Sequence, residues 1–276
     1  MEFDTVSAFV KAKPALPGGV IAVLLCETPM QVDTTARRLQ DQGARAILAI
    51  GRTDALGTLD IPVIRIAERP THRNAWVMLN TLIDALADRW LLWLWNGEYF
   101  VFPFGETRTL SDLTDFLSDE RRKVIFTYAL DLYAADLPGP QEDPAQANLR
   151  FDRIGYHAFP KEDQVLRLYG GLGWRFGEFV PKELSQIGRS SLFRATKGVW
   201  LDRKYLFEDV EYASVSCKWH HNPTAAMMSL RRARRIMAHP RFHEVRGKLI
   251  WSGSEPFAWN SQQLLELGMI EPGQWF

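Results

Sequence analysis

The segment Trp90-Leu91-Leu92-Trp93-Leu94-Trp95 is an uninterrupted apolar run, and Asn96-Gly97-Glu98 ends it. An apolar run without alternation predicts a strand that is covered on both faces, as in the parallel sheets of α/β proteins. Ligands of such sheets collect at the carboxyl ends of the strands, where Glu98 would lie. The alternative is a solvated Glu98 in a hairpin turn, because Asn-Gly is also the strongest short hairpin signal.

Strand and helix signals alternate before this run, and they favour the first interpretation. Buried-strand patterns cover residues 19–26, 46–50 and 61–66, with Pro62 suited only to an edge or a non-bonded position. Helical patterns cover residues 31–42 and 76–86, the second through an apolar stripe at helical spacing. This order predicts an α/β fold with a doubly wound, mainly parallel sheet flanked by helices and a nucleotide-type crevice above the strand ends.

The later sequence is less regular. Thr109 or Ser111 can cap a helix through Phe116, and residues 123–128 have a strand pattern. The glycine-rich segment 169–174 predicts a turn rather than a phosphate-binding loop, because no clear helix follows it.

Asn222-Pro223 is a suitable cap and first turn for a helix that runs to about Met237. Met227, Leu230 and Ile236 would form the inner stripe of this helix.

Composition restricts the partners. The chain has 276 residues, and its 33 Lys and Arg residues match its 33 Asp and Glu residues. Such a chain has no global electrostatic field that recruits nucleic acid, and we expect peripheral membrane contact at most.

Two cysteines, Cys26 and Cys217, are too few for a disulfide framework. Residues 1–18 lack the features of a signal peptide and no apolar run is long enough for a membrane span, so a cytoplasmic location is predicted.

Glu27-Thr28, Arg73-Asn74 and the segment from Asp88 to Val101 carry a family resemblance. They resemble the family 2 glycosyltransferases with a GT-A fold, and more particularly the bacterial subgroup whose central strand runs into Asp-x-Asp-Glu-Phe. Residues 190–194 and 218–221 are similar to the tail of that subgroup. The resemblance implies that Glu27, Thr28, Arg73 and Asn96 bind a nucleotide sugar.

The same resemblance implies one GT-A-like domain over residues 1–276. It would comprise a nucleotide-binding half at 19–103, an acceptor and catalytic half at 104–240, and a C-terminal extension at 241–276.

The match is degenerate where the family binds metal. The motif reads Trp95-Asn96-Gly97-Glu98-Tyr99, so the two family aspartates that hold a divalent cation and the diphosphate fall on Trp95 and Gly97. Neither residue can ligate a cation, and Glu98 alone is a weak metal site. We therefore assign no metal ligand and expect the chain either to work without metal or not to work as an enzyme.

The segment Phe207-Glu208-Asp209-Val210-Glu211-Tyr212 offers candidate bases. Sugar transfer with inversion needs a carboxylate or histidine that takes a proton from the acceptor hydroxyl. Crowded carboxylates raise at least one pKa when they are not solvated, although a solvated acidic turn is the alternative. By resemblance to the Glu-Asp pair of family 2 enzymes, Asp209 or Glu211 supplies the base, and Glu98 is the third catalytic candidate.

Basic residues near the end of this region could hold a diphosphate. By resemblance, His220 or His221 touches the diphosphate or completes a metal shell, whereas a histidine bonded to backbone is the alternative. The run of arginines at 231–235 needs acidic neighbours or an anion, and a solvated face is its usual explanation. In a metal-free transferase, Lys218, Arg231 and Arg235 would replace the cation, because basic side chains can stabilise a diphosphate.

Three functions from different classes remain. The favoured one is a glycosyltransferase that moves a sugar from a nucleotide sugar to a saccharide or lipid-linked acceptor of the cell envelope. The second is a non-catalytic GT-A-like domain that binds a nucleotide or glycan, and the third is a scaffold that exposed tryptophans would support. Nucleic acid is a poorer partner, because aromatic residues are not interleaved with the basic run.

Overall fold

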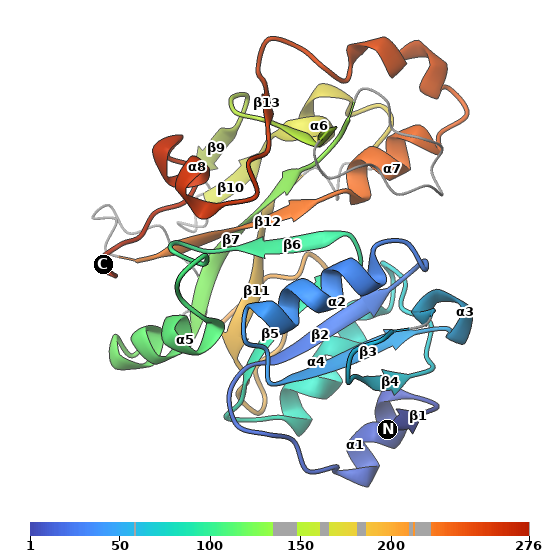
Figure 1. Ribbon diagram of the computed structural model, residues 1–276, viewed down its shortest axis with the longest axis vertical. Helices are drawn as coiled ribbons and strands as arrows, with labels where there is room; N and C mark the ends of the chain where they lie inside the picture. Colours follow the sequence, from blue (N-terminus) through green and yellow to red (C-terminus); the bar gives the residue numbers. More distant parts are fainter. Residues whose placement is uncertain are drawn as a thin grey trace. The chain divides into compact units, whose positions relative to one another are not determined.

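In the computed structural model, the apolar run Trp90–Trp95 is strand β5, and it lies between two other strands of a sheet (Figure 1). Strand β2 (Ile21–Cys26) pairs with it in parallel, and strand β11 (Gly188–Arg194) pairs with it in antiparallel. The prediction of an interior strand is confirmed.

The structure describes residues 1–57, 59–134, 148–160, 166–180, 186–209, 212 and 222–275. The chain divides into two compact units. Unit 1 comprises Met1–Gly97, Thr107–Phe126 and Ser190–Ser214, and unit 2 comprises Glu98–Glu106, Thr127–Arg189 and Val215–Phe276. The predicted division at residues 103 and 240 stays a prediction.

Unit 1 contains a mainly parallel sheet. Its strands lie in the order β1-β4-β3-β2-β5-β11, and every neighbouring pair from β1 to β5 is parallel. The elements of this unit before β11 are β1 (Glu2–Phe3), α1 (Val6–Ala12), β2, α2 (Val32–Asp41), β3 (Ala46–Gly51), α3 (Thr53–Leu56), β4 (Ile64–Ile66), α4 (Ala75–Ala85), β5, α5 (Leu110–Asp119) and the start of β7 (Val124–Asp131). The predicted α/β class is confirmed, and the predicted strands and helices occur in the predicted order, with β1, α1 and the short helix α3 as unpredicted additions.

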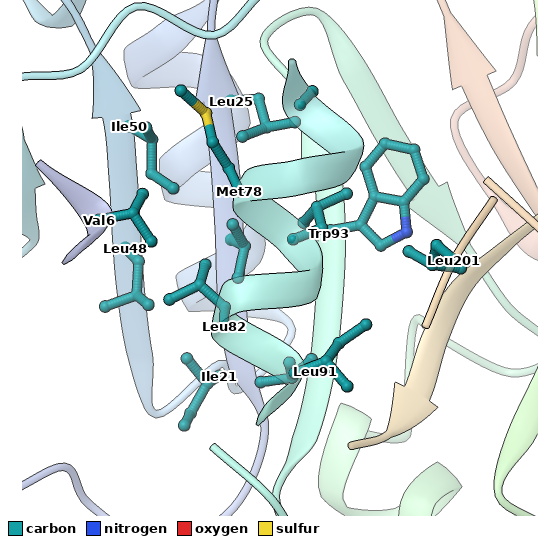
Figure 2. Packing of buried hydrophobic residues seen from close by; sticks show 14 of the residues in the cluster. Val6, Ile21, Leu25, Leu48, Ile50, Met78, Leu82, Leu91, Trp93 and Leu201 are labelled. Atoms are coloured by element: carbon teal, nitrogen blue, oxygen red, sulfur yellow. The ribbon is translucent and has the colours of Figure 1, made fainter. Parts of the chain in front are cut away.

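Helices cover both faces of this sheet, which explains why its strands are apolar without alternation. Ile21 and Leu25 of β2 point to the face that α4 covers, where Met78 and Leu82 pack on them (Figure 2). The residues of β2 that alternate with these point to the opposite face and are also fully buried. Helix α2 covers that face and lies in front of the strands in Figure 1, while α4 lies behind them.

Unit 2 is built on antiparallel pairs. Strand β12 (Thr224–Ser229) pairs with β6 (Glu98–Val101), and the end of β7 follows β12 in the strand order. The other elements of unit 2 are β8 (Arg150–Asp152), β9 (His157–Pro160), β10 (Leu166–Tyr169), α6 (Gly171–Arg175), α7 (Arg231–Met237), the short 3-10 helices η3 (Phe242–Glu244) and η4 (Arg246–Lys248), β13 (Ser254–Pro256) and α8 (Ser261–Glu266). No helix in the described ranges is long and apolar enough to cross a membrane.

The helix predicted from Asn222 to Met237 is wrong in its first half. Residues 224–229 form β12, and only residues 231–237 are helical. Met227 therefore lies on a strand opposite Phe100 rather than on a helical stripe. Pairing with β6 buries this segment in the sheet, and such tertiary pairing overrides the weak local helix signal.

Two local predictions are resolved. Thr109 rather than Ser111 is the cap of α5, because its side chain accepts from the Asp112 N–H while Asp112 bonds back to the Thr109 N–H. The turn predicted for the glycine-rich segment 169–174 is wrong over residues 171–174, which form most of the short helix α6 (Gly171–Arg175).

Candidate functional site

The direction of strand progression in unit 1 reverses between β2 and β5. From β2 the chain moves outward to β3 and β4, and then returns across the sheet to place β5 on the other side of β2. In open α/β sheets, ligands bind at the carboxyl ends of the strands that flank such a reversal. Here those ends are Cys26 and Trp95, so the candidate site is formed by the residues that follow them.

Asn96 fixes the geometry of this site. Its Oδ1 accepts from the Glu27 N–H at 3.0 Å. Its Nδ2 donates to the Met30 carbonyl at 2.8 Å and to the carbonyl and Oγ1 of Thr28 at 3.1 Å each. The Asn96 side chain is buried, and its amide bridges the backbone of residues 27–30 to the end of β5.

The turn after Asn96 is held from the other face of the sheet. The Gly97 N–H donates to Oγ1 of Thr35 on α2 at 3.0 Å. Gly97 has a positive φ of 77°, a backbone conformation that glycine adopts without the strain of a side chain. Both strand ends at the reversal are therefore tied to fixed elements of unit 1.

The predicted ligand-binding residues of unit 1 gather at this edge. Glu27 is exposed and Thr28 is half-buried directly after β2. Arg73 is exposed just before α4, and its carbonyl accepts from the indole N–H of Trp76 at 3.0 Å. The start of α4 lies at the carboxyl edge, because the helix follows the end of β4 and leads back to the start of β5.

Glu98 has a different role from the one that the sequence predicted. Its carboxylate is buried in unit 2 and accepts from both terminal nitrogens of Arg189, at 3.1 and 2.6 Å, and from Oγ of Ser229 at 3.0 Å. The solvated hairpin alternative is wrong as well, because Glu98 starts β6 and β6 pairs with β12. We interpret Glu98 as a structural anion that Arg189 neutralises.

The degenerate motif does not fit a divalent cation. The Trp95 side chain is fully buried, Gly97 has no side chain, and the Glu98 carboxylate is bonded to Arg189. Across the described ranges, no group of three or more His, Cys, Asp or Glu residues could hold a metal ion. We therefore derive no chemical step through a metal.

Asp209 is exposed and belongs to the opposite end of the unit 1 sheet. Its carbonyl accepts from the Tyr212 N–H at 3.0 Å, and the Tyr212 hydroxyl donates to the Arg194 carbonyl at 2.7 Å. Arg194 is the register partner of Trp90 at the amino end of β5. A strand of this length spans about 17 Å, so Asp209 is not brought to the edge that carries Glu27 and Asn96.

The remaining predicted residues fall into two groups. Glu211, Lys218, His220 and His221 lie outside the described residues, and the cleft predicted to join them to Glu98 stays a prediction. Arg231 and Arg235 are half-buried on α7 in unit 2.

Asp131 is an acidic partner of the arginine run, at Arg232, that no local sequence pattern indicated. Arg232 donates from Nη1 to both oxygens of buried Asp131 at 3.2 Å. The N–H of Leu172, at the start of α6, donates to the same carboxylate at 2.9 Å. Burial raises the pKa of Asp131, and Arg232 opposes that shift. The glycine-rich segment thus contributes a backbone donor to an internal aspartate.

Cys26, at the end of β2, is excluded as a nucleophile of the site. It is buried, and burial raises its pKa to about 12. At pH 8 only about one molecule in ten thousand would carry the thiolate. In a Cys217→Ser background, we expect iodoacetamide to leave Cys26 unmodified in the folded protein and to alkylate it in denaturant, measured by intact mass. Rapid native alkylation would contradict this assignment.

Comparison with known proteins gives little guidance. No family model matches the chain, and no curated protein matches it. Among solved structures, UTP-bound UGPase from Acinetobacter baumannii is similar over 85% of this chain and 100% of its own chain, with 9% sequence identity and a TM-score of 0.33. A similarity at this TM-score carries no argument about function.

Proposed function

We propose that the chain binds a nucleoside diphosphate sugar at the carboxyl ends of β2 and β5 and transfers the sugar to a saccharide or lipid-linked acceptor. The observation that supports binding is the reversal of strand order at β2 and β5, with Asn96 fixing the loop after β2 at that point. The transfer step and the acceptor class rest on the sequence resemblance to family 2 glycosyltransferases.

Each residue of this edge has a role in the proposal. The exposed Glu27 carboxylate accepts from the ribose hydroxyls, as an acidic residue does in other nucleotide-binding sheets. Thr28 offers a further polar contact beside it. The Arg73 guanidinium compensates the diphosphate, whose charge needs a partner in a partly dry cleft. Asn96 is a positioning residue, because its amide is used by the loop.

The reaction itself needs a base and a stabilised leaving group. An oxygen of the acceptor attacks the anomeric carbon and forms a new C–O bond, while the bond from that carbon to the diphosphate oxygen breaks and its electron pair stays on the diphosphate. The acceptor proton passes to a base, for which the resemblance supplies Asp209 or Glu211. The anchoring of Asp209 near the amino end of β5 counts against Asp209. By the same resemblance, Lys218, His220, His221, Arg231 and Arg235 assist the leaving diphosphate.

A second function is favoured by one observation. The turn that holds the metal motif in the family carries a buried indole, a glycine and a neutralised carboxylate here. A protein that binds the nucleotide sugar without transferring the sugar would need no further group at this turn. Product formation in a mixture of nucleotide sugars and acceptors separates the two functions.

Calorimetric titration with uridine, guanosine, cytidine and thymidine diphosphate sugars tests the binding site. We expect one of them to bind, with affinity that changes less than tenfold when manganese or magnesium is replaced by excess chelator. We expect Asn96→Ala to weaken binding at least tenfold, or about 1.4 kcal/mol, because the loop after β2 loses its tie. Absence of binding by all four classes would overturn the proposal.

The matched control is Asn80→Ala. Asn80 also bridges backbone within unit 1, donating to the Leu201 carbonyl at 2.9 Å and accepting from the Leu201 N–H at 2.8 Å. Its removal should also lower stability, because two backbone hydrogen bonds are lost, and should leave nucleotide affinity unchanged. Equal losses of affinity in both variants would show that Asn96 acts only through stability.

A further inference from the structure

Residues 201–207 form a tight hairpin in unit 1. Leu201 is bridged to Phe207, and the Asp202 N–H donates to the Leu206 carbonyl at 2.8 Å. The Asp202 carboxylate closes the turn by accepting from the N–H groups of Lys204 at 2.7 Å and Leu206 at 2.9 Å. The hairpin tip therefore presents the exposed Arg203 and Lys204 on a fixed backbone.

The chain before and within this hairpin is attached along α4. The Gly198 N–H donates to Asp84 at 2.9 Å near the end of the helix, and Asn80 is bonded to the Leu201 backbone. The Tyr205 hydroxyl donates to the His72 carbonyl at 3.4 Å before the start of the helix. Figure 2 shows Leu201 beside Trp93, on the side of the sheet that α4 covers. The outer residues of α4 and of this segment therefore belong to one surface.

Large apolar side chains are exposed on that surface. Trp200 is 59% exposed and Val77 is 48% exposed. The half-buried Trp76 has the Arg203 guanidinium 5.7 Å from its ring centroid, and its indole N–H donates to the Arg73 backbone carbonyl. Exposed apolar side chains that share one surface mark interaction sites more often than single exposed residues do.

The same surface is basic although the chain is neutral overall. We define the docking face as Arg69, Trp76, Val77, Lys197, Trp200, Arg203 and Lys204, of which the four basic residues are all exposed. The carboxylates of Asp84 and Asp202 are bonded to backbone N–H groups, and Glu208 follows the hairpin. The balance of charge on the docking face is positive.

We propose that the docking face binds the surface of an anionic lipid bilayer. Tryptophan is enriched at the boundary between headgroups and acyl chains, and basic side chains beside it attract anionic headgroups. The aliphatic Val77 and the indole of Trp200 supply the apolar contact, while Arg203 and Lys204 supply the charge. A single-stranded nucleic acid stacks on successive aromatic rings, but Arg203 already lies over the ring of Trp76, which leaves Trp200 as a single stacking platform on the docking face. This proposal goes beyond nucleotide binding and does not rest on it.

Co-sedimentation of the full chain with vesicles tests the proposal. Vesicles of phosphatidylcholine with phosphatidylglycerol should bind the chain, and vesicles of phosphatidylcholine alone should not. The double variant Arg203→Gln, Lys204→Gln should weaken binding more than tenfold, since each basic residue near an anionic bilayer strengthens binding by roughly fivefold. Trp200→Ala should weaken it severalfold, and added salt should weaken binding of the unaltered chain.

Two matched controls belong to unit 2. Trp174 is 49% exposed, so Trp174→Ala removes a comparable indole, and Arg246→Gln, Lys248→Gln removes two exposed basic residues. Neither control should change vesicle binding, and all variants should keep the melting temperature because these side chains are exposed. Equal weakening by a control and its docking-face counterpart would overturn the proposal, as would equal binding to both vesicle types.

One further arm separates headgroup phosphate from free phosphate. Excess uridine diphosphate should leave vesicle binding unchanged if the docking face recognises a bilayer. Displacement by the nucleotide would show that the cationic residues form a site for a soluble phosphate ligand and would overturn the membrane assignment. Binding of single-stranded RNA that is lost in the same variants, without binding to anionic vesicles, would overturn it in favour of nucleic acid.

Discussion

Arg189→Met is expected to lower the free energy of unfolding by about 3–5 kcal/mol, because it leaves the buried carboxylate of Glu98 without its cation. Both nitrogens of the Arg189 fork are bonded to this carboxylate, and both side chains are almost excluded from solvent. Ser229 would remain as a donor, but a single neutral hydroxyl does not replace the lost charge. Urea denaturation followed by circular dichroism measures the change.

Arg194→Met is the matched control for this prediction. Arg194 lies on the same strand β11, but its side chain is 44% exposed and its Nη2 approaches the exposed Asp88 Oδ1 no closer than 3.8 Å. Because such a surface ion pair is weak, we expect a change in the free energy of unfolding below about 0.5 kcal/mol. The double variant Glu98→Gln, Arg189→Met should recover part of the loss, since no buried charge remains unpaired. A loss in Arg189→Met no greater than in Arg194→Met would show that the Glu98 pair contributes little to stability.

Gly171→Ala is expected to destabilise the protein by about 2–4 kcal/mol, through backbone strain and a steric clash that add. Gly171 has a φ of 61°, which disfavours any side chain. A Cβ atom there would also come within 2.6 Å of Oδ2 of Asp131, the carboxylate that Leu172 and Arg232 hold. Thermal unfolding followed by circular dichroism should show a lower melting temperature.

Gly268→Ala isolates the backbone contribution. Gly268 has a similar φ of 65°, and a Cβ atom there would meet nothing within 4 Å. We expect this variant to lose about 1 kcal/mol, the cost of the left-handed backbone alone. Equal losses in both variants would mean that Asp131 moves aside and that its position is not fixed by Gly171.

Local sequence patterns were sufficient to predict the parallel part of the fold. The apolar runs that became β2, β3 and β5 have no alternation because helices cover both faces of their sheet. The helix predicted at 31–42 corresponds to α2 at Val32–Asp41, because its polar face and the glycine that follows its cap are local sequence features. Such features depend only on residues that are close in sequence, so a single sequence is enough to predict them.

Residues 224–229 form a strand that local sequence patterns did not predict. Their conformation depends on β6, more than 120 positions earlier in the chain, and the Asn-Pro pair before them suggested a helix cap instead. That error also hid the partner of Glu98, because Ser229 stands opposite Glu98 in the register of β6 and β12. Recognising an antiparallel strand at 224–229 could have revealed Ser229, whereas nothing local to Arg189 signals its pairing.

The candidate site was predictable in part. Glu27, Thr28 and Asn96 follow the strands that flank the reversal, so the order of strand and helix patterns was enough to place them together. The role of Asn96 in bridging the loop to the end of β5 was not predictable, since it depends on which atoms of residues 27–30 face the amide. Asp209 was assigned by resemblance, and its link to the amino end of β5 is visible only through Tyr212 and Arg194.

The two compact units are interleaved along the chain, and this has a consequence for how the protein can fold and evolve. The backbone passes from one unit to the other after Gly97, Glu106, Phe126, Arg189 and Ser214, and both β7 and β11 contribute residues to each unit. No single cut in the gene separates unit 1 from unit 2, so neither could have been acquired or exchanged as one exon-like block. The ribosome must also synthesise the third segment of unit 1, Ser190–Ser214, before β11 can pair with β5. Chains dominated by such distant strand pairings fold slowly.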